Sequence, residues 1–199
     1  MKPRKVIIIS IIAVLLISLT GYIMSEGKVP KGWLLSGSNS GNYEVGIDKK
    51  SREKGENVIY LKSVKENITG FGTLMQSFSA DNYLSKRARF SGYVKSKDVI
   101  GVAGLWMRID GKEDPTKPLA FDNMGNRPIV GTTEWTKYDV VLDIPSNSNM
   151  INFGILLSSS GEVWVKNLKF EAVDKTVPST DMINKSSKLT EPVNLDFGN

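Results

Sequence analysis

Apolar and polar residues alternate along much of this 199-residue sequence, most clearly in Gly104–Gly111. One row of that segment consists of Leu105, Met107 and Ile109. The other row consists of Trp106, Arg108 and Asp110. Successive side chains of a β-strand point to opposite sides of a sheet. The pattern therefore predicts a strand that is buried on one side and carries a binding surface on the other, with the rest of the chain built around it.

Other segments show a similar alternation and are bounded by turn residues. We predict strands at 43–47, 59–61, 70–80, 87–95, 98–111, 135–144, 151–158 and 162–173. In the last segment the apolar row changes sides near Lys166–Asn167, which predicts a β-bulge. No segment after residue 26 has a sustained helical period. Many short strands separated by turns are typical of a sandwich or barrel, so the predicted fold class is all-β.

The longest stretch without a clear period is Gly111–Thr133, which is rich in proline and glycine. It also contains Phe121, Met124 and Ile129, and is too apolar for a disordered segment. Loops of this length in a compact domain are usually functional or disordered. We therefore predict an ordered loop that folds over one end or one face of the domain.

The pattern of the N-terminal segment predicts a membrane-targeting helix. Met1–Lys5 is basic, and the following Val6–Met24 is almost wholly apolar. As a helix its length would be ~28 Å, close to the thickness of the hydrocarbon core. The segment is either an uncleaved signal anchor or a cleaved signal peptide. The basic start predicts that residues 27–199 lie outside the cell membrane, or are secreted after cleavage.

Composition narrows the possible chemistry. The chain has no cysteine and no histidine, which excludes disulfides, thiolate metal sites and a histidine general base. Its net charge is +5, but residues 1–26 hold three of the 26 basic and one of the 21 acidic residues, so the remainder carries only +3. That surplus is thinly spread along the sequence and does not predict a basic surface that would bind nucleic acid. We predict no metal, no cofactor and no nucleic-acid partner.

Three stretches resemble the galactose-binding-like jelly rolls that serve as carbohydrate-binding modules. Gly161–Glu171 is similar to their last strand, Gly-x-x-Trp/Phe-x-Asp-Asp-Val-x-Leu-Glu. Pro30–Trp33 matches their Pro-x-Gly-Trp, and Trp135–Pro145 matches their Trp-x-x-Tyr strand that ends in Val-Pro. The resemblance covers about residues 30–172. It implies a jelly-roll β-sandwich, preceded here by one N-terminal hydrophobic helix, that binds carbohydrate.

Two departures from that family affect the details. Lys166 and Asn167 replace the paired aspartates of the last strand, which puts a structural calcium site there in doubt. The family's opening Asn-x-x-Phe-Glu strand is absent before Pro30, yet a similar motif lies in 193–197. The tail either returns as that strand or is disordered after the linker Val177–Leu189. The predicted division is 1–26 signal or anchor, 27–173 β-sandwich, and 174–199 linker and tail.

A ligand site is predicted on the outward row of the central strand and on the long loop beside it. Tryptophan can stack on a sugar ring, and planar polar groups can bind hydroxyls on an apolar floor. The candidate residues are Gln76, Trp106, Arg108, Asp110, Asp122, Asn123, Arg127, Trp135 and Asn152. The alternative is that Trp106 packs under the loop and Arg108 forms a buried ion pair with Asp110 or Asp122.

These observations favour a non-catalytic module for a carbohydrate or similar polar ligand. A sensory or protein-interaction module, whose partner is another protein, is the first alternative. Trp106–Asp110, Phe121–Met124 and Arg127–Thr133 also resemble stretches of bacterial proteins labelled as transcription regulators, although this chain has no helix-turn-helix pattern. A carboxylate glycoside hydrolase or lyase is the second. Its candidate acids are Asp110, Glu113, Asp114, Asp122 and Glu134, and their spacing selects no pair.

Overall fold

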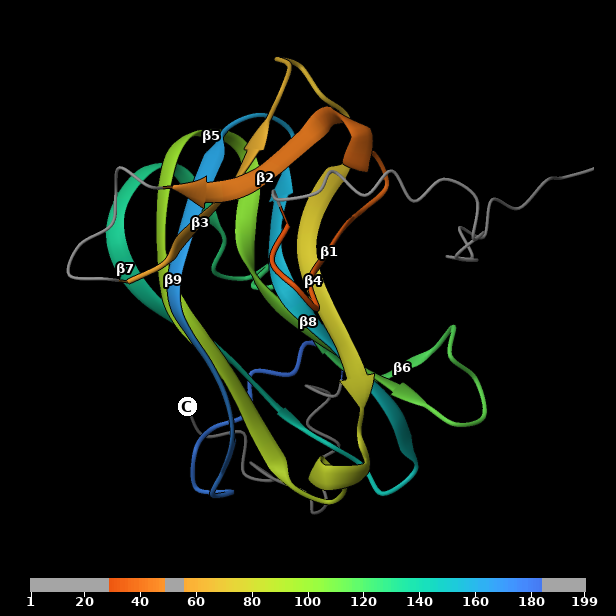
Figure 1. Ribbon diagram of the computed structural model, residues 1–199. Coiled ribbons are helices and arrows are strands. Elements are labelled where there is room, and N and C mark those ends of the chain that lie inside the picture. Colours follow the sequence, from red (N-terminus) through yellow and green to blue (C-terminus); the bar gives the residue numbers. More distant parts are fainter. Residues whose placement is uncertain (1–28, 49–55, 184–199) are drawn as a thin grey trace, which may run out of the picture.

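Nine β-strands form two layers in the computed structural model, which describes residues 29–48 and 56–183 (Figure 1). The strands are β1 (Leu34–Ser36), β2 (Tyr43–Asp48), β3 (Val58–Ser63), β4 (Phe71–Ser79), β5 (Arg87–Gly111), β6 (Pro118–Asp122), β7 (Ile129–Asp143), β8 (Ser148–Ser158) and β9 (Glu162–Val173). Two short 3-10 turns are the only helices among these described residues: Ser40–Asn42 and Asp81–Tyr83. The predicted all-β sandwich is confirmed.

The long strand β5 belongs to both layers. Its C-terminal half pairs with β8 and β6, which gives a first layer in the order β1-β4-β8-β5-β6. Its N-terminal half pairs with β9 and β7, which gives a second layer in the order β2-β3-β9-β5-β7. β5 bends where it passes from one layer to the other, and register shifts in its pairing with β7 lie there, between Val94 and Ala103. Strands that change sheets in this way do so through bulges.

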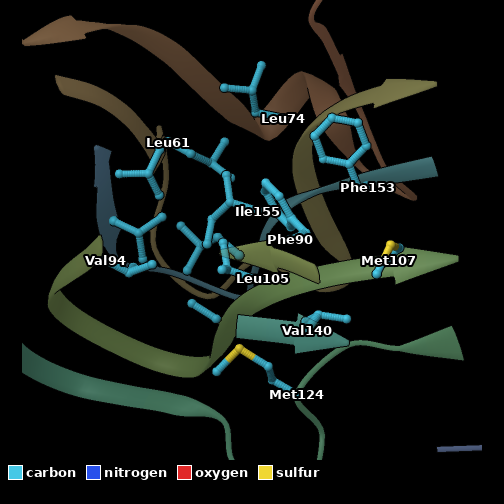
Figure 2. Packing of buried hydrophobic residues seen from close by; sticks show 14 of the residues in the cluster. Leu61, Leu74, Phe90, Val94, Leu105, Met107, Met124, Val140, Phe153 and Ile155 are labelled. Atoms are coloured by element: carbon cyan, nitrogen blue, oxygen red, sulfur yellow. The ribbon is translucent and has the colours of Figure 1, made fainter. Parts of the chain in front are cut away.

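The core lies between the two layers. It contains the alternate residues Leu105, Met107 and Ile109 of β5, each 0% exposed. Figure 2 shows Leu105 among core side chains from both layers, including Leu74 and Ile155 of the first and Phe90 and Val94 of the second. The predicted buried row of the central strand is therefore confirmed, and Trp106, Arg108 and Asp110 lie on its other side.

Two predicted boundaries are wrong. The segments 87–95 and 98–111 form one strand, because the chain bends between the layers without leaving the sheet. The stretch Gly111–Thr133 is not one loop: it contains β6 and the first residues of β7. Its pairing depends on β5, a neighbour that local periodicity does not reveal.

The predicted β-bulge in β9 is confirmed. Ser91 pairs with Lys169 and Tyr93 with Lys166, so three steps along β9 match two along β5. Asn167 takes the left-handed conformation there, with φ 53°. The side chains that replace the family's aspartates both contact Glu56: Lys166 Nζ lies 3.1 Å and Asn167 Nδ2 3.0 Å from its carboxylate. Among the described residues, no group of three or more acidic side chains could hold a metal ion.

The described part of the predicted linker packs on the sandwich. Thr180 N donates to Val141 O of β7 at 2.8 Å, and Met182 N donates to Phe121 O of β6 at 2.8 Å. The segment 178–183 is thereby hydrogen-bonded to β6, an edge strand of the first layer, and to β7, an edge strand of the second. The predicted N-terminal helix and the strand at 193–197 lie outside the described residues. Within 29–48 and 56–183, no helix has the length and apolarity needed to cross a membrane.

Candidate ligand-binding face

Strand register sets which side chains share the outer side of the first layer. Trp106 lies opposite Gly154 of β8, and Arg108 lies opposite Asn152. Asn152 in turn lies opposite Ser77 of β4. We call this surface the Trp106 face, and its residues are Thr73, Met75, Ser77, Trp106, Arg108, Asp110, Phe121, Asn152 and Leu156. It brings together four of the predicted site residues: Trp106, Arg108, Asp110 and Asn152.

A row of hydrogen bonds crosses three strands on this face. Arg108 Nε donates to Asp110 Oδ1 at 2.6 Å. Asn152 Nδ2 donates to Asp110 Oδ2 at 2.7 Å, and Ser77 Oγ donates to Asn152 Oδ1 at 2.6 Å. The row therefore runs Arg108–Asp110–Asn152–Ser77 and fixes the orientation of each planar group. The predicted alternative of an Arg108–Asp110 ion pair is confirmed, but the pair is partly exposed, with 30% and 14% of the two side chains accessible.

The row keeps hydrogen-bonding capacity toward solvent. Asn152 uses one of its two amide protons in the row, and each Asp110 oxygen accepts one bond where it can accept two. Arg108 also donates through Nη2 to the carbonyl of Pro115, in the loop before β6. Fixed donors and acceptors of this kind can bind neighbouring hydroxyl groups of a polar ligand.

The indole of Trp106 lies across the sheet. Its Nε1 donates to Thr73 Oγ1 at 2.7 Å, although Thr73 is on β4 and Trp106 on β5, with β8 between them. The ring must therefore cross β8 beside Gly154, where no side chain stands. Thr73 is buried, and its hydroxyl donates a hydrogen bond to Ile155 O at 2.8 Å. The hydroxyl must therefore accept the bond from Trp106. The half-buried indole held by this bond lies on the same outer side of the sheet as the polar row.

Gln76 does not share the Trp106 face, so that prediction is wrong. It pairs with Phe153, which lies opposite Met107 of β5. Those two residues point into the core. Adjacent residues of a strand face opposite ways, so the polar residue of β4 on the Trp106 face is Ser77 and not Gln76.

Asp122 and Arg127 form a separate buried ion pair. Asp122 is 0% exposed and lies opposite Met107, on the core side of β6. Arg127 Nη2 lies 2.6 Å from Asp122 Oδ2 and also donates to Asp139 O at 2.9 Å. The prediction that Asp122 lines the ligand site is wrong, because the parity of β6 turns its carboxylate inward. Arg127 is held against that carboxylate and keeps 33% of its side chain exposed.

The two remaining candidates have different positions. Asn123 follows β6, and its carbonyl oxygen lies 3.2 Å from where a Cβ of Gly104 would be, so its turn borders the central strand. Trp135 lies on β7 in the second layer, where Lys166 Nζ is 4.9 Å from its ring centroid. The prediction that Trp135 borders the Trp106 site is wrong, because β7 pairs with the N-terminal half of β5 there.

Sequence reasoning missed five residues of the Trp106 face: Thr73, Met75, Ser77, Phe121 and Leu156. A signal for the three on β4 was present, because the alternation of 70–80 puts Thr73, Met75 and Ser77 in one row and Gln76 in the other. Choosing between the rows requires the register with β8. Phe121 lies opposite Arg108, which only the pairing of β6 with β5 reveals.

Two of the acids proposed for a hydrolase are held in different layers. Asp122 is buried against Arg127, and Glu134 pairs with Lys95 on the second layer at 3.2 Å. Asp114 accepts the backbone N–H of Thr116 within its own loop at 2.9 Å. Hydrolysis by paired carboxylates needs two acids facing one bond, and Asp122 and Glu134 do not form such a pair.

The fold is similar to that of carbohydrate-binding modules. The CBM22-1 xylan-binding domain of Paenibacillus barcinonensis Xyn10C matches 75% of this chain and 90% of its own, with 16% identity and a TM-score of 0.51. The CBM22-1–GH10 modules of Clostridium thermocellum Xyn10B, complexed with xylohexaose, match 72% of this chain and 26% of that chain, with 13% identity and a TM-score of 0.51. This likeness confirms the predicted resemblance at the level of fold.

Sequence comparison gives a different kind of relative. The chain is 49% identical over 171 residues to the uncharacterized HTH-type transcriptional regulator YbfP of Bacillus subtilis (strain 168). The match covers 85% of this chain but 57% of the relative, so the chain spans little more than half of that protein. No family model matches the sequence.

Proposed function

We propose that this chain is a non-catalytic module that binds a carbohydrate on the Trp106 face. The observation that carries the proposal is the half-buried indole of Trp106, held across β8 by Thr73, beside the fixed row Arg108–Asp110–Asn152–Ser77. A sugar has apolar C–H faces and rings of hydroxyl groups, so an aromatic platform beside planar polar groups is complementary to it. The xylan-binding function named for a protein of similar fold supports this ligand class.

The experiment is a calorimetric titration of the full chain, held in a sugar-free detergent, with xylohexaose and a panel of neutral soluble polysaccharides. We expect saturable binding that Trp106→Ala abolishes. The matched control is Trp135→Ala, which removes the same residue type from the second layer and should leave binding unchanged. Binding that survives Trp106→Ala, or a folded protein that binds nothing in the panel, would contradict the proposal.

The identity to the Bacillus subtilis regulator favours a second candidate, in which the module is the ligand-sensing part of a regulatory protein. Residues 29–48 and 56–183 include no α-helix that could enter a DNA groove as a recognition helix. In that case a glycan bound by this chain should also bind the relative and change its affinity for DNA. A gel-shift titration of the relative with and without the glycan tests the idea, and an unchanged affinity would count against it.

We further propose that residues 27–199 act outside the cell membrane. The support is the basic start followed by the apolar run Val6–Met24, together with a ligand class abundant outside cells. Protease added to intact protoplasts should then degrade the domain. Protection that is lost only after lysis would argue for the regulatory candidate instead.

A further inference from the structure

The second layer carries an aromatic surface of its own, on the side away from the core. Glu44, Lys62 and Glu162 lie in one row across β2, β3 and β9. Gly46, Tyr60 and Trp164 lie in the next row of the same strands. We call this surface the Tyr60 face, and its residues are Glu44, Gly46, Asp48, Val58, Tyr60, Lys62, Glu162 and Trp164. It lies on the opposite side of the sandwich from the Trp106 face.

The ring of Tyr60 lies over Gly46 of β2. A Cβ on Gly46 would be 2.6 Å from the Tyr60 hydroxyl and 2.7 Å from two of its ring carbons. The glycine therefore leaves the space that the half-buried ring occupies. Burial and the neighbouring Glu44 carboxylate raise the pKa of Tyr60, so its hydroxyl stays protonated and points toward Glu44 Oε1 at 3.4 Å.

Trp164 is held in the same manner as Trp106. Its Nε1 donates to Asp48 Oδ2 at 3.1 Å, from β9 across β3 to β2. Asp48 pairs with Val58 of β3, and Val58 is only 1% exposed although it is not part of the central core cluster. The indole of Trp164 therefore spans β3, while the Tyr60 ring lies over Gly46 of β2.

The charged groups of this face are three carboxylates, on Glu44, Asp48 and Glu162, and one lysine, Lys62. Lys62 Nζ lies 2.8 Å from Glu44 Oε1 and 5.4 Å from the Tyr60 ring centroid. Glu162 lies opposite Lys62 on β3 and Lys97 on β5. Since carboxylates outnumber lysines on this face, it disfavours an anionic ligand and offers acceptors to hydroxyl groups. A neutral ligand with hydroxyl groups and an apolar ring face for Tyr60 or Trp164 is complementary to it.

We infer that the Tyr60 face is a second binding surface for a neutral saccharide, so that one module holds glycan on both sides of the sandwich. The inference shares its ligand class with the proposed function but rests on different residues. Each face has an indole that spans one strand and donates to a side chain two strands away. Two faces of one rigid sandwich would link separate glycan chains and raise the avidity for a polymer.

The four tryptophans permit a test that reads each face separately. The full chain, labelled with ¹⁵N-tryptophan in a sugar-free detergent, is titrated with xylohexaose and the neutral polysaccharide panel while the indole N–H signals are recorded. We expect the Trp106 and Trp164 signals to shift. Trp33 packs at the core edge on Phe153 and Trp135 lies under Lys166, so their signals serve as internal references.

Two variants then address the Tyr60 face alone. Tyr60→Ala removes the platform, and Gly46→Ala places a methyl group where the ring lies, so either should abolish the Trp164 shift and keep the Trp106 shift. Unmoved Trp33 and Trp135 signals establish that each variant is folded. A shift of Trp106 alone in the wild-type protein overturns the second face and leaves the proposed function standing. A shift of Trp164 alone overturns the proposed function of the Trp106 face and leaves the second face standing. A folded protein in which neither signal shifts with any saccharide overturns both proposals.

Discussion

At the scale of single residues, the most consequential polar group is the carboxylate of Asp122. It is 0% exposed, accepts the Met124 N–H at 2.7 Å and is paired with Arg127 at 2.6 Å. Arg127 is 33% exposed and also donates to the Asp139 carbonyl, so it ties the turn after β6 to β7. A buried charge is tolerated only when it is paired and hydrogen-bonded.

We predict that Asp122→Ala lowers the free energy of unfolding by about 3 kcal/mol, the low end of the range for breaking a buried pair, because Arg127 keeps some contact with water. Urea denaturation followed by tryptophan fluorescence measures the change. The control is Glu134→Gln, whose side chain is 83% exposed in its pair with Lys95 and should cost less than about 1 kcal/mol. Equal effects of the two substitutions would refute the structural role of Asp122.

At the scale of elements, Arg87 connects three parts of the chain. From the start of β5 its Nε and Nη2 donate to the two carboxylate oxygens of Asp143 on β7, at 2.9 and 2.8 Å. Its Nη1 donates to the carbonyls of Lys175 and Val177, just after β9. The hydrogen bonds from Arg87 hold the pKa of Asp143 below its usual value. This contact therefore links folding stability to pH.

The sign of that linkage is fixed by the lowered pKa. Near pH 4 the unfolded chain binds more protons at Asp143 than the folded chain, so this contribution is present at neutral pH and disappears as the pH falls through the folded-state pKa. We predict that Arg87→Met lowers the melting temperature at pH 7 and makes it less dependent on pH below about 4.5. Thermal unfolding monitored by circular dichroism at several pH values measures this effect.

Lys95→Met is the matched control for Arg87→Met. It removes a cation from the same strand, but its partner Glu134 is largely exposed. The pH profile of this variant should follow that of the wild-type protein. If Arg87→Met also follows the wild-type profile, the pair with Asp143 contributes nothing to the acid sensitivity.

At the scale of the whole molecule, the segment 178–183 fastens the two layers together along one side. Besides its backbone bonds, Thr180 Oγ1 accepts the Val141 N–H at 2.8 Å. Asp181 is 8% exposed, and its Oδ1 accepts the N–H groups of Phe121 and Ile183 at 3.2 and 3.1 Å. The exposed edges of β6 and β7 are thereby covered, which natural sheets require to avoid pairing with other chains.

We predict that Asp181→Ala lowers the free energy of unfolding by about 1–3 kcal/mol, because it leaves buried amide donors without their acceptor. Hydrogen exchange should accelerate at the amides of Phe121 and Val141 and stay slow in the core of β5. The control Asp174→Ala removes an acid whose bonds are local to Thr176, and it should change stability by less than about 0.5 kcal/mol. Unchanged exchange at Phe121 in Asp181→Ala would contradict the fastening role.

The sequence alone determined the features that depend on local periodicity. Period-2 alternation identified the buried and outward rows of the central strand, the all-β class and the bulge at Lys166–Asn167, because side-chain direction in a strand follows from position along the chain. The closing motif, with its Trp164 and Leu168, indicated a sandwich of the carbohydrate-binding kind. The same alternation already separated Ser77 from Gln76.

Only the tertiary structure decided which rows meet. The pairing of β4, β8 and β5 brought Ser77, Asn152 and Arg108 into one line, and the bend of β5 carried Trp135 to the opposite layer. The inward parity of β6 turned Asp122 into a buried partner of Arg127. The contacts of Tyr60 with Gly46 and of Trp164 with Asp48 likewise join strands that are distant in sequence. Register between such strands is set by the packing of the whole core, and no local stretch of sequence contains that information.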